Sequence, residues 1–229
     1  MNIDEFAARL LVRPGITVFD VGVHKGRCTK PYLDLGAAEV FGFEPRRKAL
    51  EELPKDLLID PRLKLMPFAL GDASGVTEIF IPDRSPAAAS IRRDFFEHHS
   101  QFHSNKKVTV DMVDICRLDD LNLPKAQFWK IDAEGAELEI LTGAKYNLTH
   151  YCPDAIQIEI FANELDRYKK TLNLIKNFFP YFWAFGIDEH QRLVYFEINT
   201  ENINKGSFHE NISKLGTPIY FASVKHLRD

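Results

Sequence analysis

An apolar segment followed by two glycines, close to the start of the chain, limits the possible folds more than any other feature. Residues 16–21 are β-branched or aromatic except for Asp20, and Gly22 and Gly26 follow ahead of a helix-like segment. A strand that turns through glycine into a helix lets a ligand approach the backbone closely. The segment therefore predicts the first β-α unit of an open α/β sheet, with a ligand site at the turn.

A second apolar strand, residues 40–43, ends at Glu44. A carboxylate at this place accepts hydrogen bonds from ribose hydroxyls in nucleoside-binding sheets. The first turn reads Asp20-x-Gly22-x-x-x-Gly26 instead of the Gly-x-Gly-x-x-Gly of pyrophosphate sites. Because an acid beside the turn suits a cationic ligand, and S-adenosylmethionine carries a sulfonium and an ammonium group, the pattern favours this cofactor over NAD.

Strand-like and helix-like segments alternate along most of the chain. Further strands are expected at residues 63–70, 76–81, 108–115, 128–131, 155–160, 181–185, 193–198 and 219–224, with a turn at Asp188-Glu189. Helices are expected at residues 4–12, 25–35, 46–53, 136–144 and 164–178. This order predicts an α/β fold with a mostly parallel central sheet and an antiparallel edge strand. We expect one domain, 1–229, in which the irregular residues 82–107 form a cap or acceptor-binding insertion.

Acidic residues follow each of the five expected parallel strands. They are Asp20, Glu44, Asp72, Asp132 with Glu134, and Glu159. The carboxyl ends of parallel strands meet at one edge of a sheet, where ligands bind. Any single acid there can be a helix N-cap or a solvated turn residue, but acids at five successive strand ends indicate a binding site.

The ordered set of short motifs resembles the FkbM family of S-adenosylmethionine-dependent methyltransferases. The matching segments are Val18-Phe19-Asp20-Val21-Gly22, Phe43-Glu44-Pro45, Ala69-Leu70-Gly71-Asp72, Trp129-Lys130-Ile131-Asp132-Ala133-Glu134-Gly135-Ala136-Glu137 and Gln157-Ile158-Glu159-Ile160. The resemblance implies a Rossmann-like class I methyltransferase fold and O-methylation of a sugar, glycan or small natural product. It assigns cofactor contacts to Asp20, Gly22, Glu44 and Asp72, and we add His24 and Gly26 from the same first loop.

Methyl transfer to a hydroxyl requires in-line approach of the oxygen and removal of its proton. Asp132, Glu134 and Glu159 are the candidate catalytic residues, with Asp132 as the expected base. The same acids have the oxygen ligands that Mg²⁺ prefers, so Mg²⁺ is an alternative cofactor, although we assign no residue as a metal ligand.

Composition narrows the remaining functions. The net charge is −4 and basic residues form no long block, which disfavours a nucleic-acid methyltransferase. The three cysteines are far apart and indicate neither a zinc site nor disulfides. We expect a cytoplasmic protein without a membrane span, acting on a small-molecule or glycan acceptor. A non-catalytic Rossmann-like binding or assembly protein is the other alternative, and the sequence does not indicate an oligomeric state.

Overall fold

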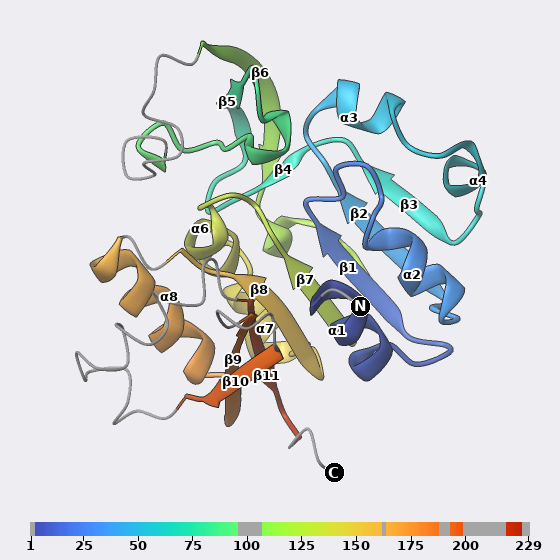
Figure 1. The fold of residues 1–229 in the computed structure, drawn as a ribbon, viewed down its shortest axis with the longest axis vertical. Helices are drawn as coiled ribbons and strands as arrows, with labels where there is room; N and C mark the ends of the chain where they lie inside the picture. Colours follow the sequence, from blue (N-terminus) through green and yellow to red (C-terminus); the bar gives the residue numbers. More distant parts are fainter. Residues whose placement is uncertain (1–2, 96–106, 162–163, 188–192, 199–218, 226–229) are drawn as a thin grey trace.

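The computed structural model describes residues 3–95, 107–161, 164–187, 193–198 and 219–225. Within them, an eight-stranded sheet has the order β3-β2-β1-β7-β8-β11-β9-β10 (Figure 1). Its strands are β1 (Thr17–Val21), β2 (Glu39–Phe43), β3 (Leu63–Met66), β7 (Phe128–Ile131), β8 (Ala155–Glu159), β9 (Tyr181–Ile187), β10 (Leu193–Glu197) and β11 (Ile219–Ser223). The strands from β3 to β8 are parallel, whereas β11 pairs antiparallel with both β8 and β9, and β10 is antiparallel at the edge. The expected α/β fold is confirmed.

Helices cover both faces of the main sheet because its central strands are apolar on both sides. In β1, Phe19 and Val21 pack on one face, together with α6 (Glu137–Thr142), α7 (Lys145–His150) and α8 (Leu165–Lys176). Val18 packs on the other face, where α1 (Ile3–Leu11), α2 (Thr29–Asp34) and α4 (Lys55–Leu58) lie. These two hydrophobic clusters, with a third between α1 and the strands β9 and β11, hold the sheet between its helices.

A second, three-stranded sheet has the order β4-β6-β5. Its strands are β4 (Ala69–Leu70), β5 (Gly75–Pro82) and β6 (Val108–Cys116). Figure 1 shows this small sheet beside the end of the main sheet where β1 and β2 terminate, with α3 (Arg47–Glu51) nearby. It therefore adds a wall next to the carboxyl ends of the parallel strands.

The prediction of one continuous strand over residues 63–70 is wrong. The segment breaks at Pro67 into β3, which pairs with β2, and β4, which pairs with β6 in the small sheet. Proline has no N–H to donate to a strand ladder, and the Phe68 amide instead donates to the carbonyl of Met66 at 2.9 Å. The chain therefore changes sheets at this point.

The other expected strands and helices are present with small shifts at their ends. Within the described residues, four short helical segments were not predicted: α4, α7, η1 (Pro86–Ala88) and η3 (Leu118–Asp120). Three to six residues are too few for a helical pattern of apolar residues to be visible in a sequence. The expected turn at Asp188-Glu189 and residues 96–106 of the expected cap lie outside the described residues.

Candidate active site

A cavity of about 520 Å³ lies where β1, β2, β7 and β8 reach their carboxyl ends. This is the edge at which open α/β sheets bind ligands, and the volume is within the usual range for small-molecule sites. The predicted site residues that line it are Gly22, His24, Glu44, Asp132, Glu134 and Glu159. The small sheet and the segment that follows β5 contribute an apolar wall that includes Leu70, Ile79 and Ile91.

The turn after β1 requires glycine at position 22. Gly22 has a φ of +85°, and a Cβ there would lie 2.0 Å from the backbone oxygen of Asp132. The Gly22 amide donates to the carbonyl of Phe43 at 2.9 Å, and the Asp132 amide donates to the carbonyl of Val21 at 3.1 Å. The turn is therefore held between the ends of β2 and β7, with space for neither a side chain nor a shift.

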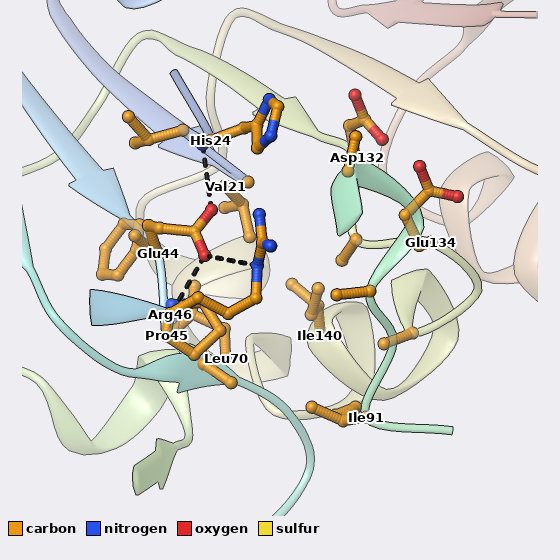
Figure 2. A pocket seen from close by; sticks show the side chains of 18 of the residues that line it. Val21, His24, Glu44, Pro45, Arg46, Leu70, Ile91, Asp132, Glu134 and Ile140 are labelled. Carbon is orange, nitrogen blue, oxygen red and sulfur yellow. Dashed lines mark hydrogen bonds and ion pairs between the residues drawn. The ribbon is translucent and has the colours of Figure 1, made fainter. Parts of the chain in front are cut away.

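Glu44 lies at the end of β2 and is only 4% exposed. One carboxylate oxygen accepts from the His24 amide at 2.9 Å, and the other accepts from the Arg46 amide at 2.9 Å (Figure 2). The guanidinium of Arg46 adds an ion pair at 3.4 Å. Each carboxylate oxygen can accept a further hydrogen bond, so Glu44 fixes the first loop and still offers acceptors to a ligand.

A loop with unusual backbone conformation presents Glu134 to the cavity. Glu134 has a φ of +50°, and His24, the other described non-glycine residue with positive φ, has a φ of +49° and lines the same cavity. The buried carboxylate of Glu137 accepts from the amides of Ala133 at 3.0 Å and Gly135 at 3.2 Å, on either side of Glu134. Left-handed backbone at non-glycine residues is costly and concentrates at functional sites.

The carbonyl of Gly135 anchors this loop from outside. It accepts from the guanidinium groups of Arg92 and Arg167, each at 3.0 Å. Arg92 also pairs through both terminal nitrogens with Glu164, at 2.9 and 2.6 Å. A Cβ on Gly135 would lie 2.4 Å from the ring of Phe95. The loop after β7 is therefore rigidly supported before any ligand binds.

The three candidate catalytic acids have different electrostatic environments. Burial raises the pKa of Glu134 to about 8, and the negative charges of Asp132 and Glu137 act in the same direction. Burial and the charge of Asp132 raise the pKa of Glu159 well above its usual range. Burial alone would raise the pKa of Asp132, but the charge of Lys130 and hydrogen bonds from Lys130 and Glu159 outweigh it, so the net pKa is lowered. The two environments therefore favour the protonated form of Glu159 and the ionised form of Asp132.

Lys130, on β7, was missed as a site residue by the sequence analysis. Its Nζ lies 3.0 Å from the carboxylate of Asp132 and donates to the carbonyl of Gly22 at 3.3 Å. Arg46, also missed, points into the cavity beside Glu44 (Figure 2). A lysine within the apolar strand Phe128–Ile131 was a usable signal, because a charged residue is buried only where it is paired. Nothing local distinguished Arg46 from a solvated helix residue.

Three predicted cofactor residues do not line the cavity. Asp20 is 0% exposed and lies behind it, where Thr29 donates to its carboxylate at 2.5 Å. Gly26 has a φ of +74° and packs on Leu57 of α4. Asp72 is exposed, because the strand break at Pro67 moves it away from the main sheet. The expectation that Asp72 ends the third strand of the main sheet is therefore wrong.

A second hollow of about 1230 Å³, here called the outer groove, adjoins the cavity. The two share His24, Lys25, Pro45, Arg46 and Ala87. Charged residues of both signs line the outer groove: Lys25, Arg46, Arg47, Lys48, Glu51, Glu52, Asp83, Asp111 and Asp114. Residues of the expected cap, among them Ala87, Ala89 and Ile91, line the cavity itself. The cavity thus opens into a groove between α3 and the small sheet that both charged and apolar residues line.

Metal binding finds no support in the described part of the chain. No three or more His, Cys, Asp or Glu residues there are grouped so that they could hold a metal ion. The structure therefore gives no reason to retain Mg²⁺ as a cofactor. In the same residues, none of the helices has the length and apolar character needed to cross a membrane.

No curated protein sequence matches the chain. A crystal structure described as methyltransferase FkbM from Methylobacillus flagellatus KT has 15% sequence identity and a TM-score of 0.53, and covers 95% of this chain. The chain spans 50% of the length of that protein. A putative rRNA methylase from Clostridium thermocellum has 12% identity and a TM-score of 0.51, over 97% of this chain and 94% of its own.

These structural similarities show the fold, and a sequence comparison shows the family. The profile of the family described as "Methyltransferase FkbM domain" matches residues 20–209, which is most of the chain and includes every residue that lines the cavity. Membership implies the use of S-adenosylmethionine. The chain belongs to the FkbM methyltransferase domain family.

Proposed function

We propose that this methyltransferase transfers a methyl group from S-adenosylmethionine to a hydroxyl of a sugar, glycan or small natural product. One observation carries the proposal: the cavity has Glu44 on one side and Asp132, Glu134 and Glu159 on the other. A carboxylate suited to accept hydrogen bonds from a ribose therefore faces a group of acids across one small-molecule site. A cofactor bound between them would present its reactive end to the acids.

The cavity fits the cofactor by its chemistry. Glu44 would accept hydrogen bonds from the ribose hydroxyls, and the apolar wall around Leu70 and Ile140 suits an aromatic base. The turn at Gly22 would lie under the amino acid end, close to the carboxylate of Asp132. Proposed cofactor contacts are therefore Gly22, His24 and Glu44, with Asp20 and Gly26 supporting the loop from behind.

The outer groove supports a hydroxylated acceptor. Its four cationic and five anionic side chains offer hydrogen-bond donors and acceptors in similar number. A polyhydroxyl chain can bind to both, whereas a nucleic-acid backbone would meet the carboxylates of Asp83, Asp111 and Asp114. A wholly apolar acceptor would cover these mostly exposed charges without offering them hydrogen-bond partners. The groove therefore favours a sugar or another polar acceptor.

The bound cofactor supplies a methyl group activated by a sulfonium. The acceptor oxygen forms a bond to that methyl carbon as the carbon–sulfur bond breaks, and the hydroxyl proton passes to a carboxylate. The products are a methyl ether and S-adenosylhomocysteine. The role of the protein is to orient the hydroxyl in line with the methyl group and to accept the proton.

The acids divide these tasks according to their environments. Asp132 is ionised and held by Lys130, which suits it to orient the hydroxyl by accepting its hydrogen bond. Glu134, with a pKa of about 8, is the stronger base once it has lost its own proton, so it would receive the hydroxyl proton mainly at about pH 8 and above. Glu159 remains protonated and supports Asp132 through a hydrogen bond. Asp132 is the base expected from the sequence, but the electrostatics favour Glu134.

The proposal is tested in two steps. Titration calorimetry with S-adenosylmethionine should show binding; a chain that does not bind the cofactor would instead be a non-catalytic binding protein. Mass spectrometry after incubation with hydroxylated sugars, small natural products and RNA should then detect a methyl ether only on a hydroxylated small molecule or glycan. Methylation of RNA alone would contradict the proposal.

A further inference from the structure

The ammonium of Lys130 joins groups that come from the ends of two strands, β1 and β7. Besides Asp132 and Gly22, it lies 3.9 Å from Asp20 on the neighbouring strand β1. Lys130 is 3% exposed and Asp20 is 0% exposed. Of the two carboxylate oxygens of Asp20, one accepts from Thr29, and the oxygen facing Lys130 has no hydrogen-bond partner among the described residues. The charge of Lys130 favours the ionised form of Asp20, but burial outweighs it and raises the pKa of Asp20.

Buried charges of one sign gather around this ammonium. Two carboxyl groups lie within ion-pair distance of it, and Glu159 adjoins one of them. Other titratable groups that act on this cluster are Asp4, Arg27, Cys28, Glu134 and Glu137. Arg27 also favours the ionised form of Asp132, but less than Lys130 does. Removing Lys130 would leave the acids without their nearest compensating charge, which is costly in a buried site.

The same contacts also fix geometry. The Gly22 carbonyl belongs to the turn on which the cofactor would lie, and the Asp132 carboxylate is the group proposed to orient the acceptor. Because one Nζ binds both, the turn and the carboxylate cannot move independently while Lys130 is in place. A small displacement between the cofactor and the orienting acid can cost a large factor in rate.

We propose that Lys130 is a positioning residue for methyl transfer, whose buried ammonium holds the glycine turn of β1 and the carboxylate of Asp132 in one fixed arrangement. The part of this inference that concerns methyl transfer rests on the proposed function. The part that concerns the turn and the carboxylate does not, and it is measurable without an acceptor.

The test compares the full-length protein with its Lys130→Met variant by two measurements. In carbon-13 NMR of the side-chain carboxyls, the midpoint of the Asp132 titration should rise by about one pH unit or more, since an opposite charge at this distance shifts it by that amount. In titration calorimetry, affinity for S-adenosylhomocysteine should fall at least about tenfold, because the charge-assisted bonds that hold the turn are lost. Lys130→Arg restores the positive charge, so it should show a smaller shift of the Asp132 titration and a smaller loss of affinity than Lys130→Met.

Two further variants make the result decisive. Lys125→Met is the control, because Lys125 pairs with Asp154 at 3.5 Å on the surface, and it should change neither measurement. If Lys130→Met does not fold, Lys130→Met combined with Asp20→Asn removes both buried charges together, and the same shifts are expected. Wild-type titration of Asp132 and unchanged affinity in either folded variant would overturn the inference. Absence of binding by the wild-type protein would overturn the proposed function instead.

Discussion

The carboxyl group of Glu134 provides a direct test of the electrostatics of the site through protein stability. Burial, followed by the charges of Asp132 and Glu137, raises the pKa of Glu134 from its ordinary value of 4.5 to about 8. Between these two pH values the folded protein keeps a proton that the unfolded chain has released. The stabilisation is therefore complete below about pH 4.5 and is lost as pH rises through about 8.

The size of the effect follows from the same values. One pKa unit corresponds to about 1.4 kcal/mol, so complete ionisation would lower the free energy of unfolding by about 4–5 kcal/mol in a rigid site. Rearrangement of the loop reduces this, and we expect about 2–4 kcal/mol. Glu134→Gln cannot ionise and should therefore be more stable than the wild type by this amount near pH 9, with similar stability near pH 5.

Urea unfolding at several pH values measures the difference, with fluorescence of the buried Trp129 and Trp183 as the signal. Glu51→Gln on the exposed surface of α3 is the matched control and should follow the wild type at every pH. Glu134→Gly separates the charge from the backbone: it also removes the left-handed strain, and so should gain about 1 kcal/mol even near pH 5. Parallel pH curves for the wild type and Glu134→Gln would refute the reasoning.

Three further predictions concern the cofactor cavity. Glu44→Ala should weaken binding of S-adenosylhomocysteine at least about tenfold in calorimetry, since each lost charge-assisted hydrogen bond is worth about 1.5–3 kcal/mol; full affinity with an intact circular dichroism spectrum would contradict the role of Glu44. Gly22→Ala should abolish measurable binding, because the new Cβ would lie 2.0 Å from the Asp132 oxygen, and normal binding would show that the turn can shift. Asp72→Ala should leave affinity within about twofold, because its side chain is exposed outside the cavity; a large loss would restore it as a cofactor residue.

Local patterns in the sequence were sufficient to predict six residues that line the cavity: Gly22, His24, Glu44, Asp132, Glu134 and Glu159. The strands that carry Gly22, Glu44 and Asp132 are short apolar segments bounded by glycine, proline or acids. Strands that alternate with helices are parallel, so their carboxyl ends share one edge. This rule brought residues far apart in the chain to one cavity without any knowledge of their contacts.

Local patterns could not decide which face of a strand a side chain occupies at its end. The family resemblance assigned Asp20 to the cofactor, yet its side chain points behind the cavity toward Thr29 of α2. Side chains alternate between the faces of a sheet with a period of two. The path of the turn after a strand decides which face of the strand end meets the ligand. The path of that turn depends on the packing of other elements.

The sequence by itself therefore determined the family, the parallel order that brings the strand ends together, and the presence of acids there. Only the tertiary structure decided that Pro67 sends the chain into a second sheet, that Asp72 is thereby removed from the site, and that Lys130 lies among the acids. The physical reason is that strand identity depends on local residue preferences, whereas sheet partners, burial and the pKa of a carboxyl group depend on residues that are distant in the chain.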